Sequence, residues 1–400
     1  MKKIIYFVPE FVASKDGVFK SQVLIPASLI KDAGSEVEII TCDKKEHTFE
    51  KKNEISESNI KKTILPYFSN KINIFTILLA CFRATIWLIK NKEEYLEQNV
   101  IIYTRYCISG YFINTLARNK KNITWIHDFR GLSSEEMILD KKKTPINYYW
   151  FKILQYFEYI CATRASQLLS VSQTMTQYLQ NKYSNLRINT IPASVDIRLF
   201  EGKEKIREDL RKNWNVNNDE WVFVYSGSFL KWQKPDEIIR LLRSLELSIL
   251  KTHILVITQD VDLLKQKADL LKIDITHWHI FSTNKVEETY NLLSASDIGI
   301  ILREDILINH VASPIKISEY LASGVALAST PNIGCIKSLM GETDILCSIS
   351  FDVNRSTKSI IDFCNYHVDK SNLRSKCKSL AIEKFSWQSS IAKYAELYCL

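Results

Sequence analysis

The stretch "DIGIILREDILINHVASPIKISEYLASGVALAST", residues 297–330, contains two short apolar runs with a helical pattern between them. "DIGIIL" and "GVALAST" are bounded by loop residues, which is typical of buried strands in a parallel sheet. In "SPIKISEYLASG" we expect Ser313 to be the N-cap, Pro314 the first helical residue and Gly324 the residue just past the helix end. A strand, a helix and a second strand in this order predict an α/β fold.

The same alternation continues along the whole chain. Strand-like runs in the first half are "KIIYFVP", "EVEIIT", "VIIYTR", "ITWIHD", "QLLSVS" and "RINTIPA"; those in the second half are "WVFVYSG", "THILVIT", "HWHIFS", "DIGIIL" and "GVALAST". We therefore predict two successive doubly wound α/β domains. The boundary is placed at residues 195/196, within "IPASVDIRLF", shortly before the pattern changes to a polar, charged segment. Two such lobes would bind ligands at the carboxyl ends of their strands and in the cleft between them.

Composition agrees with a globular protein of two domains. The chain has 400 residues, of which 46% are hydrophobic and 24% charged. Its nine cysteines are scattered and show neither a disulfide framework nor metal-ligand spacing. This use of cysteine suggests a reducing, cytoplasmic compartment. The first apolar run of the chain is broken by Pro9 and Glu10, so it resembles a buried strand more than a signal peptide.

Positive charge is concentrated in the first half. Residues 1–195 contain 27 Lys and Arg against 18 Asp and Glu, and residues 196–400 contain 26 against 27. A basic half predicts an anionic partner. Because no nucleic-acid-binding motif accompanies the charge, we expect an anionic membrane surface and no nucleic acid.

Two stretches of the first half bear on membrane binding. "NIFTILLACFRATIWLIK", residues 73–90, is almost long enough to span a bilayer, but Arg83 lies in its middle, which argues against a span. We expect a mostly buried helix, with a helix lying in the membrane interface as the alternative. "NYYWFKILQYFEYI", residues 147–160, is rich in aromatic residues and keeps peripheral membrane attachment open.

The helix in the opening stretch places Lys316 and Glu319 on one face and Ile317, Tyr320 and Leu321 on the other. A lysine that precedes its glutamate is the weaker order for an ion pair, and Lys316 lies near the positive end of the helix dipole. A surface ion pair remains one interpretation. The other is a phosphate site at the helix start, with Glu319 accepting hydrogen bonds from sugar hydroxyls.

Further candidate residues follow predicted strands. In the first half they are Gly17, Arg105 and the His127-Asp128-x-Arg130 segment, which collects a titratable donor, a carboxylate and a guanidinium. In the second half, Gly227 and Ser228 form a small-residue loop that is followed by Lys231 and Lys234. The loop matches neither the Walker motif nor G-x-G-x-x-G, so it is either a solvated turn or a diphosphate site.

Taken together, these segments resemble bacterial family-4 glycosyltransferases with the two-lobed GT-B fold. "IHDFRGLSSEE" resembles the His-Asp-x-Arg-Gly segment of capsule and lipopolysaccharide members, and "YSGSFLKWQ" resembles their donor-phosphate loop. "VASPIKISEYLASG" is the most specific match, to the nucleotide-sugar motif. "FSWQSSIAKYAELY" is similar to their last helix, so the resemblance implies a first domain of residues 1–195 plus 384–400 and a second of 196–383.

The resemblance also implies site residues. Glu319 would hold the ribose hydroxyls, the amides of residues 314–316 with Lys231 or Lys234 would neutralise the diphosphate, and His127 would lie beside the donor sugar. The implied catalytic residues are His127, Asp128 and Arg130. The implied donor-binding residues are Gly227, Ser228, Lys231, Lys234, Arg303, Ser313, Pro314, Ile315, Lys316 and Glu319. The implied acceptor-binding residues are Asp16, Gly17, Lys20, Arg105 and Glu135.

The implied reaction needs no metal or cofactor. The donor would be a UDP- or GDP-linked sugar, transferred with retention of configuration to a lipid-linked saccharide at the inner face of the cytoplasmic membrane. Fixed cations and helix amides would stabilise the leaving diphosphate, which would itself take the acceptor proton.

Two positions depart from the family pattern. Val311 stands where many relatives have a second glutamate, and Phe229 replaces an arginine of the phosphate loop. A non-catalytic partner subunit therefore remains an alternative, and a nucleotide-sugar epimerase is a weaker one.

Overall fold

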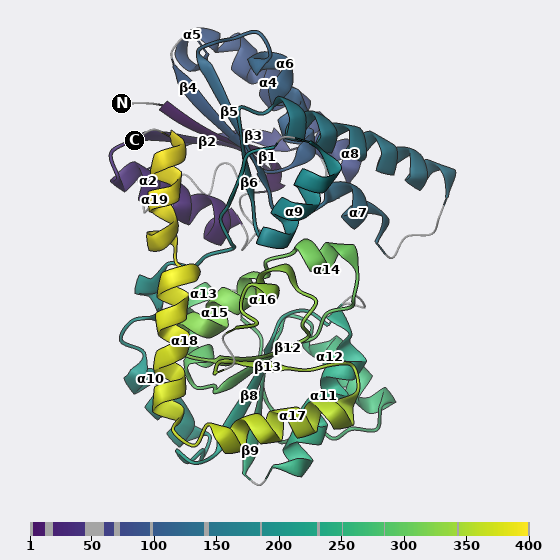
Figure 1. The fold of residues 1–400 in the computed structure, drawn as a ribbon, viewed down its shortest axis with the longest axis vertical. Coiled ribbons are helices and arrows are strands. Elements are labelled where there is room, and N and C mark those ends of the chain that lie inside the picture. The colour runs from purple at the N-terminus through teal and green to yellow at the C-terminus, as the bar shows by residue number, and fades with distance from the viewer. Residues whose placement is uncertain are drawn as a thin grey trace. The chain divides into compact units, whose positions relative to one another are not determined.

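A computed structural model describes residues 3–12, 19–44, 60–67, 73–96, 99–139, 144–184, 186–229, 233–249, 251–283, 285–341 and 344–398. The chain divides into two compact units (Figure 1). Unit 1 comprises Met1–Pro192 and Ser390–Leu400, and unit 2 comprises Ala193–Ser389.

Unit 1 is built on a seven-stranded sheet with the order β3-β2-β1-β4-β5-β6-β7, in which all strand pairs are parallel. Its strands are β1 (Lys3–Val12), β2 (Glu36–Lys44), β3 (Lys61–Tyr67), β4 (Val100–Thr104), β5 (Ile123–Phe129), β6 (Gln167–Ser170) and β7 (Ile188–Thr190). Its helices are η1 (Lys20–Leu24), α2 (Ile25–Asp32), α4 (Ile74–Lys90), α5 (Lys92–Tyr95), α6 (Cys107–Ala117), α7 (Ser133–Ile138), α8 (Pro145–Arg164) and α9 (Gln173–Lys182).

Unit 2 is built on a six-stranded parallel sheet with the order β10-β9-β8-β11-β12-β13. Its strands are β8 (Trp221–Ser226), β9 (Thr252–Ile257), β10 (His279–Phe281), β11 (Ile298–Ile301), β12 (Ala326–Ser329) and β13 (Leu346–Ser348). The helices before β11 are η3 (Ile197–Phe200), α10 (Glu204–Asn213), α11 (Pro235–Ser248), α12 (Val261–Leu270) and α13 (Val286–Ser294). Those after it are α14 (Leu307–Val311), α15 (Ile315–Ala322), α16 (Gly334–Lys337), α17 (Val353–Tyr366) and α18 (Lys370–Lys384), and α19 (Trp387–Tyr398) continues from unit 2 into unit 1.

The expected α/β class with two doubly wound sheets is confirmed. Helices cover both faces of each sheet (Figure 1), so central strands such as β4, β8 and β11 are buried along their whole length. This explains their continuous apolar sequences. In each sheet the strand order reverses beside the first strand, between β1 and β4 and between β8 and β11, and the carboxyl ends at such a point are where doubly wound folds bind ligands.

The helix of the opening stretch begins later than the sequence indicates. Helix α15 starts at Ile315 with Pro314 at the N-cap position, and no side chain caps it. The expected N-cap role of Ser313 is wrong, because its hydroxyl instead accepts a hydrogen bond from the amide of Ala193 at 3.2 Å. The prediction for the other end is confirmed: Gly324, with φ +77°, follows the C-cap residue Ser323 just past the helix end.

Helix α4 is not the mostly buried helix that we expected. It packs small residues, Ala80, Cys81 and Ala84, against the unit, while Phe75 is 64% exposed and Phe82 is 50% exposed. Small residues and Leu88, which is fully buried, pack on one side, and several bulky apolar side chains remain exposed on the other. Among the described residues, no helix combines the length and the apolar character that crossing a bilayer requires.

Candidate functional site

The carboxyl ends of β8 and β11 in unit 2 bring together Gly227, Lys316 and Tyr225. The ammonium Nζ of Lys316 lies 4.8 Å from the centre of the Tyr225 ring. Gly227 has φ +151°, and a Cβ built on it would lie 2.0 Å from Nζ. Only a glycine therefore lets the lysine lie against the backbone here. The loop and the helix, predicted separately as phosphate-binding segments, meet at this point.

Lys316 is partly buried, and burial with the nearby charge of Arg303 lowers its pKa to about 7. Glu319, one helical turn further along α15, has a pKa raised to about 7 by burial, although Lys316 and a 3.4 Å hydrogen bond from the Tyr290 hydroxyl act in the opposite direction. Both groups are thus poorly solvated in the absence of a ligand. The buried face of α15 is the predicted one, with Ile317, Tyr320 and Leu321 in the core.

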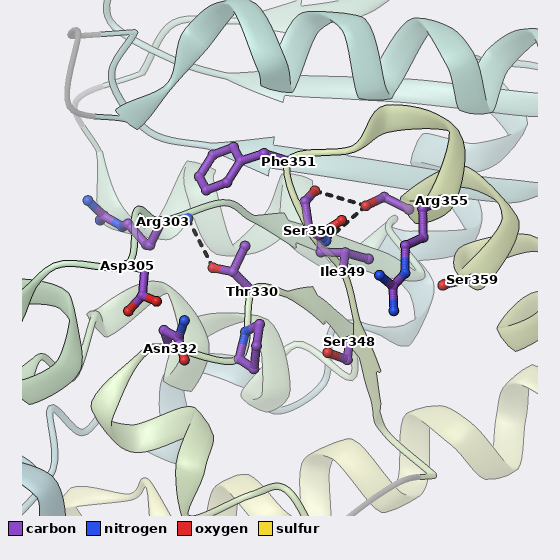
Figure 2. A pocket seen from close by; sticks show the side chains of 12 residues that line it. Arg303, Asp305, Thr330, Asn332, Ser348, Ile349, Ser350, Phe351, Arg355 and Ser359 are labelled. Carbon is purple, nitrogen blue, oxygen red and sulfur yellow. Dashed lines mark hydrogen bonds between the residues drawn. The ribbon is translucent and has the colours of Figure 1, made fainter.

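Arg303 follows β11 and is only 8% exposed. Burial lowers its pKa to about 10, with Tyr225 acting in the opposite direction. Its backbone amide donates to Thr330 Oγ1 at 3.0 Å. Figure 2 shows its guanidinium pointing away from Ser348 and Arg355. Arg303 therefore acts on the charge of Lys316 and also lines a neighbouring pocket.

That pocket has a volume of about 290 Å³ and lies among the loops that follow β11, β12 and β13 (Figure 2). Nine of its twelve lining residues carry polar side chains, and Phe351, which is 38% exposed, is among the apolar ones. The polar lining comprises Arg303, Asp305, Thr330, Asn332, Ser348, Ser350, Arg355, Ser356 and Ser359. Hydroxyl, amide and guanidinium groups beside an exposed aromatic ring suit a ligand that carries many hydroxyl groups.

The expected loop cations are placed less favourably. Lys231 lies outside the described residues. Lys234 forms an ion pair with Glu304, so a diphosphate would have to compete with that carboxylate. Ser228 is half-buried, and its carbonyl accepts a 2.6 Å hydrogen bond from the Tyr225 hydroxyl.

Both departures from the family pattern are core residues. Val311 is 2% exposed, at the end of α14. Phe229 is fully buried, and the centre of its ring lies 5.1 Å from the centre of the Tyr225 ring. Its backbone amide donates a 2.8 Å hydrogen bond to Asp260 Oδ2. Neither position offers a polar group to a ligand.

In unit 1, His127 lies on β5 beside Thr104 of β4, in register. Its Nδ1 is 2.8 Å from Thr104 Oγ1, and its ring contacts Phe129 edge-on at 4.6 Å. The residue is 1% exposed, and burial lowers its pKa to about 3 despite the nearby carboxylate of Asp128. His127 is therefore neutral at physiological pH.

Alternation along β5 turns Asp128 to the opposite face. Its Oδ2 accepts hydrogen bonds from Tyr103 and, at 2.5 Å, from Arg130 Nε. Arg130 also donates to the carbonyl of Ile191 at 3.3 Å and to the hydroxyl of Tyr394 at 3.2 Å. Asp128 and Arg130 thus join β5 to the C-terminal helix α19 and do not share a face with His127.

The residues expected at the acceptor are only partly brought together. Arg105, just after β4, is 9% exposed and donates to the carbonyl of Gln22 at 2.7 Å. Lys20 is exposed at the start of η1, and Glu135 is half-buried in α7. Asp16 and Gly17 lie outside the described residues.

Sequence reasoning missed Glu10, near the end of β1. Burial raises its pKa to about 7, against the effect of Arg105 and Ser109. In the sequence, Glu10 directly follows the apolar run "KIIYFVP". A carboxylate at the end of a predicted strand was the signal that could have identified it. Reasoning from sequence also missed Arg355, because α17 shows no motif at its start.

No family model matches the chain, and no curated protein matches it. Solved structures do. Sucrose-phosphate synthase from Thermosynechococcus elongatus superposes with a TM-score of 0.75 at 14% identity, covering 100% of this chain and 98% of that one. A glycosyltransferase from Rickettsia africae gives 0.68 at 18% identity, covering 99% and 98%.

The fold is GT-B. A third similar structure is HepE from Anabaena, solved in complex with UDP, with a TM-score of 0.70 at 14% identity and full coverage of both chains. At these identities the likeness establishes the architecture of this GT-B chain, and its chemistry has to be argued from its own residues.

Proposed function

We propose that this chain is a glycosyltransferase that binds a nucleoside diphosphate sugar in unit 2. The observation that carries the proposal is the pair of cations, Lys316 and Arg303, whose pKa values are both lowered at the β8/β11 switch point. Two poorly solvated cations gain most from a ligand with adjacent negative charges, such as a diphosphate. Solved complexes of the similar HepE with UDP and with UDP-glucose support this ligand class.

The rest of the donor fits the neighbouring groups. Amides at the start of α15, from Ile315 onward, and the Gly227 backbone would add hydrogen bonds to the diphosphate. Glu319 would accept hydrogen bonds from the ribose. The transferred sugar would occupy the 290 Å³ pocket beyond Arg303, where Arg355 and the serine hydroxyls are available.

We assign His127 to the donor sugar as a neutral hydrogen-bond donor, while Asp128 and Arg130 would support the strand that carries it. Arg105, Lys20 and Glu135, with Asp16 and Gly17, would serve the acceptor. The reaction would be retaining and metal-independent, as in family 4, with the leaving phosphate accepting the acceptor's proton.

The acceptor would be a lipid-linked saccharide used in surface polysaccharide synthesis, reached from the cytoplasmic face of the membrane. Support comes from an apolar surface on α4 and α8, called here the α4–α8 surface. Its exposed residues are Phe75, Leu79, Phe82, Ile89, Ile146, Tyr148, Tyr149, Tyr156 and Tyr159. Phe75 and Trp150 contact edge-on at 5.0 Å, which joins the two helices. An exposed aromatic surface on the basic half of the chain suits an anionic membrane interface.

A screen of nucleotide sugars by thermal shift, followed by calorimetry, tests the donor site, because a ligand of the folded state raises its stability. Glu319→Ala should weaken binding of the selected donor by roughly 1.5–3 kcal/mol, through loss of charge-assisted hydrogen bonds. The matched control is Glu288→Gln, which removes a surface ion pair with Lys285 on α13. Unchanged donor affinity in Glu319→Ala would reject the ribose role.

Incubation with donor and membrane extract then distinguishes the alternatives. Transfer to lipid supports the proposal. Donor binding without turnover would indicate a non-catalytic partner subunit, which the apolar Val311 and Phe229 favour as the second candidate. Isomerised donor without transfer would indicate an epimerase.

A further inference from the structure

Three buried side chains on β4 and β5 form a hydrogen-bonded chain. Trp125 Nε1 donates to Thr104 Oγ1 at 2.9 Å, and Thr104 Oγ1 lies 2.8 Å from His127 Nδ1. All three residues are at most 1% exposed. The arrangement follows from strand geometry: Thr104 is the register partner of His127, and Trp125 precedes His127 by two residues on the same face.

The position of each proton follows from the donors available. The indole N–H can only donate, so it occupies one acceptor position of the threonine oxygen. The threonine hydrogen then has two possible acceptors, the carbonyl of Ile126 at 3.5 Å and His127 Nδ1 at 2.8 Å. The shorter distance is the usual one for a hydroxyl donor, whereas 3.5 Å is long.

We infer that Trp125 and Thr104 are positioning residues that fix His127 as the neutral tautomer with its hydrogen on Nε2. Nδ1 then accepts from Thr104, and Nε2–H remains to donate. Among the described residues, none hydrogen-bonds to Nε2. The pKa of His127, lowered to about 3 by burial, agrees with a neutral ring.

The ring is also held by its packing. A Cβ built on Gly110 of α6 would lie 2.9 Å from His127 Nδ1 and 2.5 Å from the sulfur of Cys161 on α8. The imidazole therefore lies directly against the α6 backbone. If the proposed function holds, His127 presents a hydrogen-bond donor to the donor sugar and is not the base that deprotonates the acceptor.

The tautomer is measured by long-range ¹H–¹⁵N correlation NMR on the full-length protein labelled with ¹⁵N-histidine. Of the seven histidines, His127 is assigned by the signals lost in His127→Gln. We expect a pyridine-like Nδ1 and a pyrrole-like Nε2 at neutral pH. The reverse pattern, with the hydrogen on Nδ1, would overturn the inference, because Thr104 would then accept from both neighbours.

Variants test the residues that hold the tautomer. Thr104→Val should produce a mixture of tautomers, and Thr104→Ser should restore the single one. The control is Thr85→Val, since Thr85 is buried in α4 and donates only to the carbonyl of Cys81 in its own helix. If Thr104→Val does not fold, Trp125→Phe replaces it, and we expect partial transfer of the hydrogen to Nδ1. An unchanged Nε2–H tautomer in the folded variant would contradict the role.

The activity measurement rests on the proposed function and is read separately. Thr104→Val should lower kcat by about tenfold with little change in the donor KM, the order expected when one positioned hydrogen bond is lost. Thr104→Ser should recover most of the lost kcat, and Thr85→Val should have the kcat of the wild type. A wild-type chain with the expected tautomer but no transferase activity would reject the proposed function alone.

Discussion

At the scale of single residues, Lys316 and Glu319 carry the strongest physical signal of function. They share a helix face, yet both have pKa values moved to about 7 because burial disfavours their charged forms. A surface ion pair would instead stabilise both charges. The shifted pKa values therefore favour a ligand site over a solvated surface ion pair as the interpretation of Lys316 and Glu319.

This makes donor affinity depend on pH. The pKa of Lys316 is about 7 with Glu319 present, and the Glu319 charge raises it. In Glu319→Gln, where the carboxyl no longer titrates, that pKa should be lower still, so Lys316 of the free protein is largely neutral above pH 7. A bound diphosphate would restore that proton, so binding takes up a proton and affinity should fall by at most about tenfold per unit between pH 7.5 and 9.5. Calorimetry in buffers of different ionisation enthalpy measures the proton uptake.

The matched variant is Lys316→Arg in the same background. A guanidinium keeps its charge throughout this range. Between pH 7.5 and 8.5, below the pKa of about 10 of Arg303, its affinity should be nearly independent of pH. An equal slope in both proteins over that range would show that another group titrates.

At the scale of elements, the donor site depends on how a loop meets a helix. The β8 loop approaches α15 closely because Gly227 has no side chain. At the residue before Gly227, the amide of Ser226 donates a 2.9 Å hydrogen bond to the phenol of Tyr320, which ties α15 to the end of β8. The loop and the helix start are thus held together before any ligand binds.

Gly227→Ala should displace the Lys316 ammonium and weaken donor binding. The comparison is Gly202→Ala, because Gly202 also has a positive φ, +66°, but a Cβ there meets no atom within 4 Å. Both substitutions should cost some stability, of order 1 kcal/mol, through the unfavourable backbone conformation. Thermal unfolding measures that shared cost. Calorimetry should show a lower donor affinity for Gly227→Ala only. Equal donor affinities of Gly227→Ala and Gly202→Ala would show that Gly227 is not part of the donor site.

At the scale of the whole molecule, charge and exposed apolar surface occur in the same part of the chain. Residues 1–195 carry 27 basic against 18 acidic side chains, and the α4–α8 surface belongs to unit 1. Basic residues near an anionic membrane contribute about 1 kcal/mol each, and buried aromatic residues add a part that salt does not screen.

The full chain should therefore sediment with liposomes, more strongly as the anionic lipid content rises. Replacing Phe75, Leu79 and Phe82 of α4 with serine should reduce binding, and most of all at high salt. The control protein carries serine in place of Leu247 and Leu270 of unit 2, which are 70% and 76% exposed. Equal loss in both proteins, or no binding by the wild type at low salt, would remove membrane attachment from the proposal.

The amino-acid sequence by itself determined most of the fold. Every predicted strand run contains a strand. For central strands such as β4, β8 and β11 the reason is that a continuous apolar run is buried where helices cover both faces of the sheet. Strands β3 and β13 were missed. The first, "KKTILPY", contains two lysines and a proline, and the second, "LCS", is interrupted by serine, so neither shows a long apolar run.

The sequence also determined that Lys316 and Glu319 share a helix face, since helical periodicity fixes that within a few residues. Only the tertiary structure decided what each meets. The nearness of Lys316 to Gly227, 89 positions earlier in the chain, depends on β8 and β11 being neighbours in the sheet. Alternation along β5 separates His127 from Asp128, but the partners that the two faces meet, Thr104 of β4 and Tyr394 of α19, come from distant parts of the chain. Long-range pairing of strands and burial set these contacts and their pKa values, and no local pattern encodes either.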